Sequence, residues 1–155
     1  MEENSPAPRG SSRLKLLVPT NFSHKSEMAL NFALAYSARN PGGAEIFLFH
    51  SYDEKNVDYR HLDKVNEDVI ERMKTVVLHA IEGMTQRGDG HGVETVHRRL
   101  SYGKPPVEIL KVAAGIGADM IIMGSPNSSK YRRLIEKAPC SLVMLKDKDP
   151  TFVTE

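Results

Sequence analysis

The sequence predicts an α/β protein built as a single doubly wound, open parallel sheet of five strands with helices on both faces. Three observations support this prediction. Short apolar runs alternate along the chain with longer amphipathic segments, the pattern of repeated strand–helix–strand units. The apolar runs are continuous, as expected for strands that are covered on both faces. The length of 155 residues, with 40% hydrophobic residues, fits one domain with a substantial core.

The first half of the predicted domain begins with a short buried strand at residues 14–19. Ser23 is a suitable N-cap for the helix that follows, because its hydroxyl can accept a hydrogen bond from a first-turn amide. That helix ends at the NPGG turn, residues 40–43, and a second apolar strand follows at residues 45–51. A long amphipathic helix then extends from about residue 59 to residue 86, with apolar residues at three- and four-residue steps.

The second half of the domain begins with a more polar strand at residues 93–103, which we expect near a sheet edge. Pro105 opens the next helix, since proline is tolerated in a first turn, and Gly117 ends it. The buried side of this helix is predicted to contain Val107, Leu110, Ala113 and Ala114.

Two further strands complete the predicted sheet, at residues 119–124 and 141–146, with a short helix at about residues 130–137 between them. The domain therefore covers residues 13–146. Residues 1–12 are rich in Pro, Gly, Ser and Asn and are predicted to be a disordered tail, and residues 147–155 form a second tail.

Composition and charge exclude several classes of protein. The chain has 21 basic and 20 acidic residues and a net charge of +1, whereas a nucleic-acid-binding protein shows a marked basic excess. The apolar runs are far shorter than a membrane span, and the N-terminal segment lacks the apolar core of a signal peptide. The single cysteine, Cys140, excludes an internal disulfide and agrees with a reducing compartment. We therefore expect a cytoplasmic protein that binds neither nucleic acid nor membrane.

The carboxyl ends of the predicted strands are where a ligand would bind, because an open parallel sheet forms its crevice there. The candidate residues at these ends are Pro19, Thr20, Asn21, Ser51, Met123, Gly124 and Ser125. Thr20 and Asn21 offer hydrogen bonds, and Ser23 would place the start of a helix beside a bound anion. A purely local interpretation is also open, in which Ser23 only caps its helix and Asn21 only closes a turn.

Several segments resemble the universal stress protein family. The family's first strand typically runs into Pro-Thr/Val-Asp-x-Ser and a helix, and its counterpart here is LLVPTNFSHKSEMALNFALAYS. The second strand is matched by AEIFLFHSYD, the third helix and fourth strand by GKPPVEILKVAAGIGADMIIMGS, and the last strand by APCSLVMLK. The resemblance covers nearly the whole chain and keeps the order of the elements. It implies a Rossmann-like sheet of order 3-2-1-4-5, usually in a dimer, and a role in stress physiology with or without bound ATP.

The sequence departs from the family's ATP-binding members after the fourth strand. Those members continue as Gly-x-x-Gly, nine residues and Gly-Ser/Thr, and the glycines let backbone amides surround the phosphates. This chain has Gly124, then Pro126 and Asn127, and no further glycine. Proline removes an amide donor, and positive φ is cheap only for glycine. Asn21 also replaces the family's usual Asp, and a neutral amide is a poorer partner for magnesium.

We therefore expect a non-enzymatic stress-response or regulatory protein that does not bind ATP in the family's usual manner and needs no cofactor. The alternative is a switch of the same fold that holds ATP or AMP in a shortened phosphate site. In that alternative Arg132 and Arg133 replace the missing loop, because guanidinium groups suit phosphate and an anion would offset cations placed at a helix start. The competing interpretation of these arginines is a solvated basic face.

The last predicted strand also suggests how the chain assembles. In the family's strand order it forms an edge of the sheet, and residues 142–145 are apolar on both of its faces. A bare apolar edge aggregates unless it is paired or covered, so we expect a homodimer in which residues 141–146 of two chains pair antiparallel. Coverage by the C-terminal tail is the alternative. The six histidines and Cys140 lack metal-ligand spacing and no nucleophile motif is present, so no metal site or catalytic residue is predicted.

Overall fold

The computed structural model describes residues 13–52, 62–86, 96–126 and 129–146. Within these ranges the chain forms one five-stranded parallel sheet of order β3-β2-β1-β4-β5. The strands are β1 (Leu14–Pro19), β2 (Ala44–Tyr52), β3 (Val96–Tyr102), β4 (Met120–Gly124) and β5 (Ser141–Leu145). The predicted fold class and strand order are confirmed, and the more polar third strand forms one edge of the sheet, as expected.

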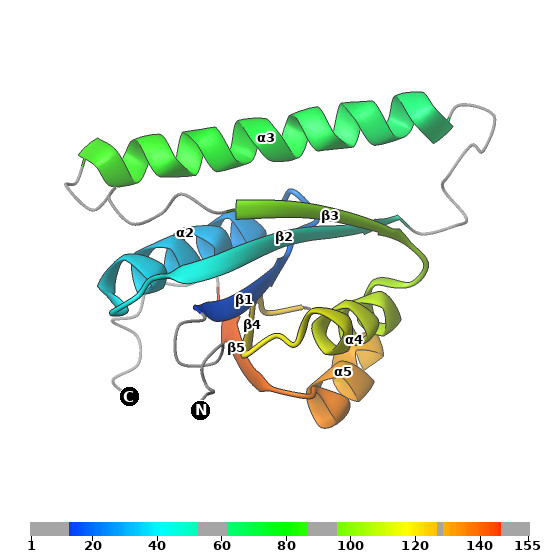
Figure 1. The fold of residues 1–155 in the computed structure, drawn as a ribbon. Helices are drawn as coiled ribbons and strands as arrows, with labels where there is room; N and C mark the ends of the chain where they lie inside the picture. The colour runs from blue at the N-terminus through cyan, green and yellow to red at the C-terminus, as the bar shows by residue number, and fades with distance from the viewer. Residues whose placement is uncertain (1–12, 53–61, 87–95, 127–128, 147–155) are drawn as a thin grey trace, which may run out of the picture.

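The helices cover the two faces of the sheet (Figure 1). The helices α2 (His24–Arg39) and α3 (Leu62–Gln86) lie on one face, and α4 (Pro105–Ile116) and α5 (Arg132–Lys137) lie on the other. A separate apolar core fills each space. One contains Leu16 and Val18 of β1 against α2 and α3, whereas the other contains Leu17 of the same strand against α4 and α5. Because β1 is buried on both faces from Leu16 to Pro19, this part of the strand is apolar at successive positions, as the continuous run predicted.

The helix ends follow the predicted chemistry. The backbone N–H of Ser26 donates to Oγ of Ser23 at 3.3 Å, so Ser23 is the N-cap of α2. Gly117 has the left-handed φ of 69° and ends α4, and glycine adopts this φ without a Cβ penalty. The predicted short helix begins with a 3-10 turn, Ser129–Tyr131, followed by α5. No helix in the described ranges combines the length and the apolarity needed to cross a membrane.

The predicted buried side of α4 is wrong in part. Ala113 is buried as expected, but Val107 is 43% exposed and Ala114 is also exposed. The side chain of Ile109 is buried instead, in the apolar core that α4 forms against the sheet. The sequence of this helix is apolar on several sides, so its periodicity did not define one face. Packing against β2 and α5 selected the stripe that contains Ile109 and Ala113.

Candidate functional site

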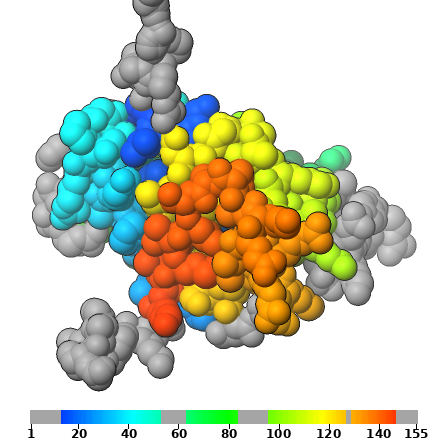
Figure 2. All heavy atoms as spheres, turned by 90° about the horizontal axis from the view of Figure 1, so that it is seen from below, coloured from blue at the N-terminus to red at the C-terminus, as the bar shows by residue number. Residues whose placement is uncertain are grey.

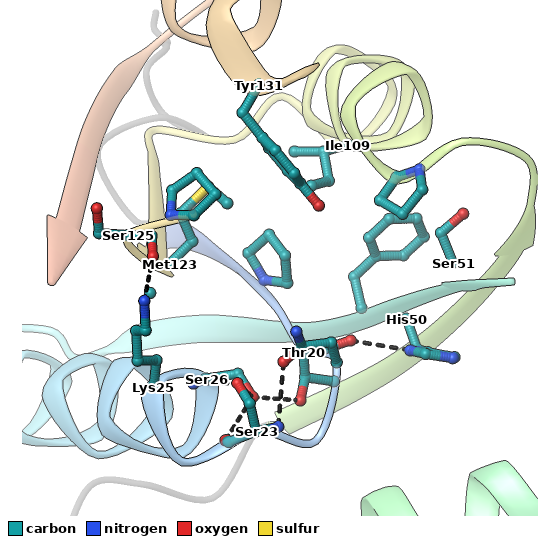
Figure 3. A pocket seen from close by; sticks show the side chains of 16 residues that line it. Thr20, Ser23, Lys25, Ser26, His50, Ser51, Ile109, Met123, Ser125 and Tyr131 are labelled. Carbon is teal, nitrogen blue, oxygen red and sulfur yellow. Dashed lines mark hydrogen bonds between the residues drawn. The ribbon is translucent and has the colours of Figure 1, made fainter. Parts of the chain in front are cut away.

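A cavity of about 330 Å³ lies at the carboxyl ends of β1, β2 and β4 (Figure 3). We call it the strand-end cavity. All seven predicted strand-end residues line it: Pro19, Thr20, Asn21, Ser51, Met123, Gly124 and Ser125. The topology brings them together because the strand order reverses between β1 and β4, which leaves a crevice there. The volume falls at the lower end of the range for small-molecule sites, about 300–1,000 Å³.

The hydroxyl and amide groups after β1 hold the turn into α2. Thr20 is buried, and its Oγ1 donates to Oγ of Ser26 at 3.0 Å and accepts from the Phe22 amide at 3.0 Å. Oδ1 of Asn21 accepts from the Ser23 amide at 3.1 Å. The local roles predicted for Ser23 as a cap and for Asn21 as a turn residue are therefore present in the structure, although both residues also line the cavity.

An aromatic cluster lies beside this turn. Phe22 is the one residue other than glycine with positive φ in the described ranges, at 64°. Its ring centroid is 5.0 Å from that of His50, and the guanidinium carbon of Arg72 in α3 lies 4.2 Å above the ring. Nδ1 of His50 lies 2.8 Å from the carbonyl oxygen of Thr20. Burial lowers the pKa of His50, and the charge of Arg72 lowers it further against the opposing effect of the Thr20 carbonyl, so a neutral ring donates through Nδ1 at pH 7.

The end of β4 is packed tightly between α2 and β5. A Cβ added to Gly124 would lie 2.5 Å from Cβ of Lys25, so the glycine permits the close approach of α2. The amide of Ser125 donates to the carbonyl of Leu145 at 2.7 Å, which continues the ladder with β5. Pro126 has no amide hydrogen. The backbone from Ser125 to Pro126 therefore directs no amide at the cavity.

Among the cavity residues that the sequence analysis missed, Lys25 and Tyr131 carry the polar groups that matter most for a ligand. Lys25, in the first turn of α2, donates from Nζ to the carbonyl of Ser125 at 2.8 Å. Tyr131 comes from the 3-10 turn on the opposite side, and its hydroxyl end points into the cavity (Figure 3). Burial raises the pKa of Tyr131, so its hydroxyl stays protonated near neutral pH. A lysine at a helix start and the one aromatic residue between β4 and β5 were the signals available in the sequence.

The predicted arginine pair lies elsewhere. Arg132 and Arg133 are exposed and are not among the residues that line the strand-end cavity. The wall contains one lysine, Lys25, and no aspartate or glutamate among the described residues. Its apolar portion includes Phe49, Ile109 and Met123. The cavity therefore combines an apolar body with one positive charge at the end of β4.

Two other chemistries find no support in the described residues. They contain no group of three or more His, Cys, Asp or Glu side chains positioned to hold a metal ion. Cys140 is half-buried, and burial together with the charge of Asp119 raises the pKa of its thiol. Since the thiolate is the reactive form of cysteine, this environment disfavours a nucleophilic role.

The geometry agrees with comparisons to known proteins. A sequence model of the universal stress protein family matches residues 13–146. The chain belongs to the universal stress protein family. Universal stress protein MJ0577 of Methanocaldococcus jannaschii is 26% identical over 91% of this chain and 94% of its own length. Its solved structure gives a TM-score of 0.63, covering 87% of this chain and 96% of that one.

Two further members of the universal stress protein family show the same fold. A protein from Burkholderia pseudomallei is 25% identical, with a TM-score of 0.59 over 84% of this chain and 94% of that one. A protein from Arabidopsis thaliana, solved with AMP bound, is 16% identical, with a TM-score of 0.53 over 92% of this chain and 97% of that one. Family membership supports a stress-response protein.

Proposed function

We propose that this universal stress protein is a non-enzymatic regulator that acts through partner contacts and does not hold ATP in the family's usual manner. One observation carries the proposal. The two described residues directly after β4 offer no free N–H group, because the Ser125 amide donates to Leu145 and Pro126 has no amide hydrogen. A triphosphate held by a glycine loop needs several amides at this point.

The packing of Gly124 supports the same conclusion. This glycine is the one residue that matches the family's phosphate motif, and the space beside its Cα is filled by Lys25. Its conformation needs no left-handed φ, because the positive-φ glycines of the described residues are Gly42, Gly43, Gly103 and Gly117. Gly124 is thus explained by the approach of α2. Among the described residues that line the cavity, Nδ1 of His50 faces the carbonyl of Thr20 and not a hydroxyl group that it could activate.

Isothermal titration calorimetry with ATP and magnesium tests this proposal. We expect no heat of binding at micromolar protein concentration, and no ATP among the small molecules released when the purified protein is denatured. Micromolar ATP binding, or ATP recovered in stoichiometric amount, contradicts the proposal. Turnover of ATP above the uncatalysed rate, abolished by a single substitution in the cavity wall, would contradict the non-enzymatic part separately.

The strand-end cavity favours a second candidate, a switch that responds to a small adenine ligand such as AMP. Its volume of about 330 Å³ and its apolar body suit a planar base, and Thr20, Asn21 and Ser51 contribute polar groups to the wall. The AMP bound to the Arabidopsis protein shows that this fold can hold such a ligand. Adenosine and AMP, titrated separately, test this candidate, and the absence of binding by both would refute it.

The position of β5 at an edge of the described sheet supports a proposed homodimer. β5 is the last strand in the sheet order, and it pairs with β4 alone among the described strands. Leu142, Val143, Met144 and Leu145 are only half-buried, and β5 lies at the surface in the view from below, in orange-red (Figure 2). An apolar edge is stabilised when a second copy pairs with it. Light scattering coupled to size-exclusion chromatography tests this, and a monomer at tens of micromolar excludes it.

A further inference from the structure

We infer that Ser101 is a phosphorylation site for a kinase that selects arginine before the serine, and that its phosphate displaces Glu108 and moves the start of α4. The inference does not depend on whether the strand-end cavity holds a ligand, because neither residue lines that cavity. It adds a point of control to a chain that we propose acts as a regulator.

The sequence around Ser101 is the first argument. Arg98 and Arg99 stand three and two positions before the serine, and Tyr102 follows it. Kinases discriminate between substrates partly through the charges around the reacting hydroxyl, and arginine at these positions binds acidic groups of the enzyme. Both arginine side chains are exposed, although Arg99 also lies over the ring of Phe47 at 5.6 Å. An enzyme can therefore reach the two residues that it would recognise.

The place of Ser101 in the sheet is the second argument. The serine is the second-last residue of β3, an extended edge strand that pairs with β2 alone among the described strands. The chain leaves the sheet at Gly103, whose φ of 142° is easy for glycine and unfavourable for other residues. Ser101 is half-buried, so access requires the end of one edge strand to open and leaves the two cores closed.

The surroundings of the Ser101 hydroxyl determine what a phosphate does there. Oγ of Ser101 donates a hydrogen bond to Oε1 of Glu108, a buried residue in the first turn of α4. Oε2 of the same carboxylate lies 3.4 Å from Nζ of Lys111, and a Cβ added to Gly103 would lie 2.7 Å from this oxygen. The carboxylate thus fills the space between the serine and the turn.

The transfer step replaces a hydrogen-bond donor with an anion. Oγ of Ser101 attacks the γ-phosphorus of ATP in the kinase, the bond from that phosphorus to the bridging oxygen breaks, and ADP leaves with the bonding electron pair. The hydroxyl proton passes to the catalytic aspartate of the kinase. The product carries a charge of about −1.5 to −2 at pH 7. It can no longer donate to Glu108, and two anionic groups now face each other, so the carboxylate must move away.

The backbone amides at the start of α4 cannot receive the phosphate. The N-cap, Lys104, makes no side-chain cap bond, and the first two helical residues are prolines without amide hydrogens. The amides of Val107 and Glu108 already donate to the Lys104 carbonyl. Displacement of Glu108 therefore moves the start of α4, where Pro105 and Ile109 line the strand-end cavity (Figure 3).

The test treats the folded full chain with ATP, magnesium and the catalytic subunit of cyclic-AMP-dependent protein kinase, which selects arginine before serine. We expect stoichiometric phosphate, placed on Ser101 by mass-spectrometric fragmentation of the wild type, and none at this position in Ser101→Ala. Arg98→Ala/Arg99→Ala should lower kcat/KM of the kinase by about 10-fold or more, because it removes charge-assisted contacts. Thermal melting of each variant before treatment shows that it is folded.

The chain contains its own matched control. Arg132 and Arg133 begin a second Arg-Arg-Leu triplet, in which Ile135 stands where Ser101 follows the first. Arg132→Ala/Arg133→Ala changes the net charge of the chain by the same amount as the first double variant. It should leave phosphorylation of Ser101 unchanged.

Hydrogen exchange tests the displacement of Glu108. The amides of α4 should exchange several-fold faster in the phosphorylated chain than in the unmodified chain, whereas those of α2 should not change. Glu108→Gln keeps an acceptor for the Ser101 hydroxyl but removes the charge, so phosphorylation should accelerate exchange in α4 less in this variant. Equal acceleration in both chains would contradict the repulsion between the phosphate and Glu108.

The remaining outcomes are decisive for the site itself. Absence of phosphate on Ser101 in the folded chain overturns the inference, and a synthetic peptide of residues 96–103 then shows whether recognition or access has failed. Equal rates for the wild type and Arg98→Ala/Arg99→Ala overturn the role of the arginines. Unchanged exchange in α4 after stoichiometric phosphorylation overturns the proposed movement of that helix.

Discussion

Replacing Gly124 with alanine tests whether this residue is a packing glycine or the remnant of a phosphate loop. The added Cβ would lie 2.5 Å from Cβ of Lys25, 3.0 Å from its carbonyl carbon and 3.1 Å from its carbonyl oxygen. Carbon atoms in good contact are about 3.5–4.0 Å apart, so the first turn of α2 must move. Two of the three contacts are with backbone, which cannot rotate away as the end of a flexible side chain can.

The expected cost follows from similar overpacked cores. Inserting a methyl group into a filled space destabilises a protein by about 1–3 kcal/mol. In a chain of this length each kcal/mol lowers Tm by about 2–4 °C, so Gly124→Ala should lower Tm by about 2–12 °C. Urea denaturation and thermal melting in the absence of ligand measure the effect, because ligand binding would add its own stabilisation.

Gly115 provides the matched control. It lies within α4, and apart from the backbone of that helix and its two chain neighbours no atom lies within 4 Å of a Cβ added there. Gly115→Ala should therefore stabilise the protein by about 0.5–1 kcal/mol, as expected for a helical glycine. A double-mutant cycle with Lys25→Gly, which removes the nearest contact, should recover part of the loss. If Gly124→Ala stays within about 0.5 kcal/mol of the wild type, the packing argument fails and the phosphate-loop explanation regains support.

Three further predictions concern other parts of the molecule. Phe22→Gly should be more stable than Phe22→Ala by about 1–2 kcal/mol. Both variants lose the ring, but only alanine has a Cβ that makes the φ of 64° unfavourable. Equal unfolding midpoints in urea would show that the turn relaxes. The lowered pKa of His50 means that the folded state binds fewer protons than the unfolded state, so stability should be full above the unfolded pKa of 6.5 and fall as pH decreases below it. His50→Gln should flatten that dependence between pH 8 and pH 5 in urea denaturation, whereas an unchanged slope assigns it to other groups. Met144→Lys should convert the proposed dimer to a monomer in light scattering, because it places a charge on the half-buried edge strand; a variant that stays dimeric locates the interface elsewhere.

The fold was predictable because its signals are local. The apolar residues 16–19 are buried on both faces of the sheet, and Ser23 and Gly117 cap their helices through bonds within a few residues. The strand order came from the family resemblance, and the sheet confirms it. The buried side of α4 was less predictable, because a helix that is apolar on several sides takes its orientation from its neighbours.

The cavity was predictable in place but not in chemistry. Strand ends must meet at one edge of a parallel sheet, so Thr20 and Met123 were expected together. Lys25 was not, since its partner Ser125 is 100 residues away in sequence and no periodicity encodes that contact. Arg132 and Tyr131 are adjacent in the chain, and only the orientation of the 3-10 turn decides that the tyrosine lines the cavity.

The contacts at the end of β4 connect the two proposed properties of the protein. Ser125 accepts a hydrogen bond from Lys25 through its carbonyl and donates one to Leu145 through its amide, so one residue links the cavity to the edge strand. A glycine loop would leave this segment flexible, but the packing of Gly124 against Lys25 and the fixed φ of Pro126 restrict it. The contact between Lys25 and Ser125 therefore lies two hydrogen bonds from β5, where we propose that the second chain pairs. If the cavity binds a ligand and β5 forms the proposed dimer, we therefore expect the two events to be coupled through Ser125.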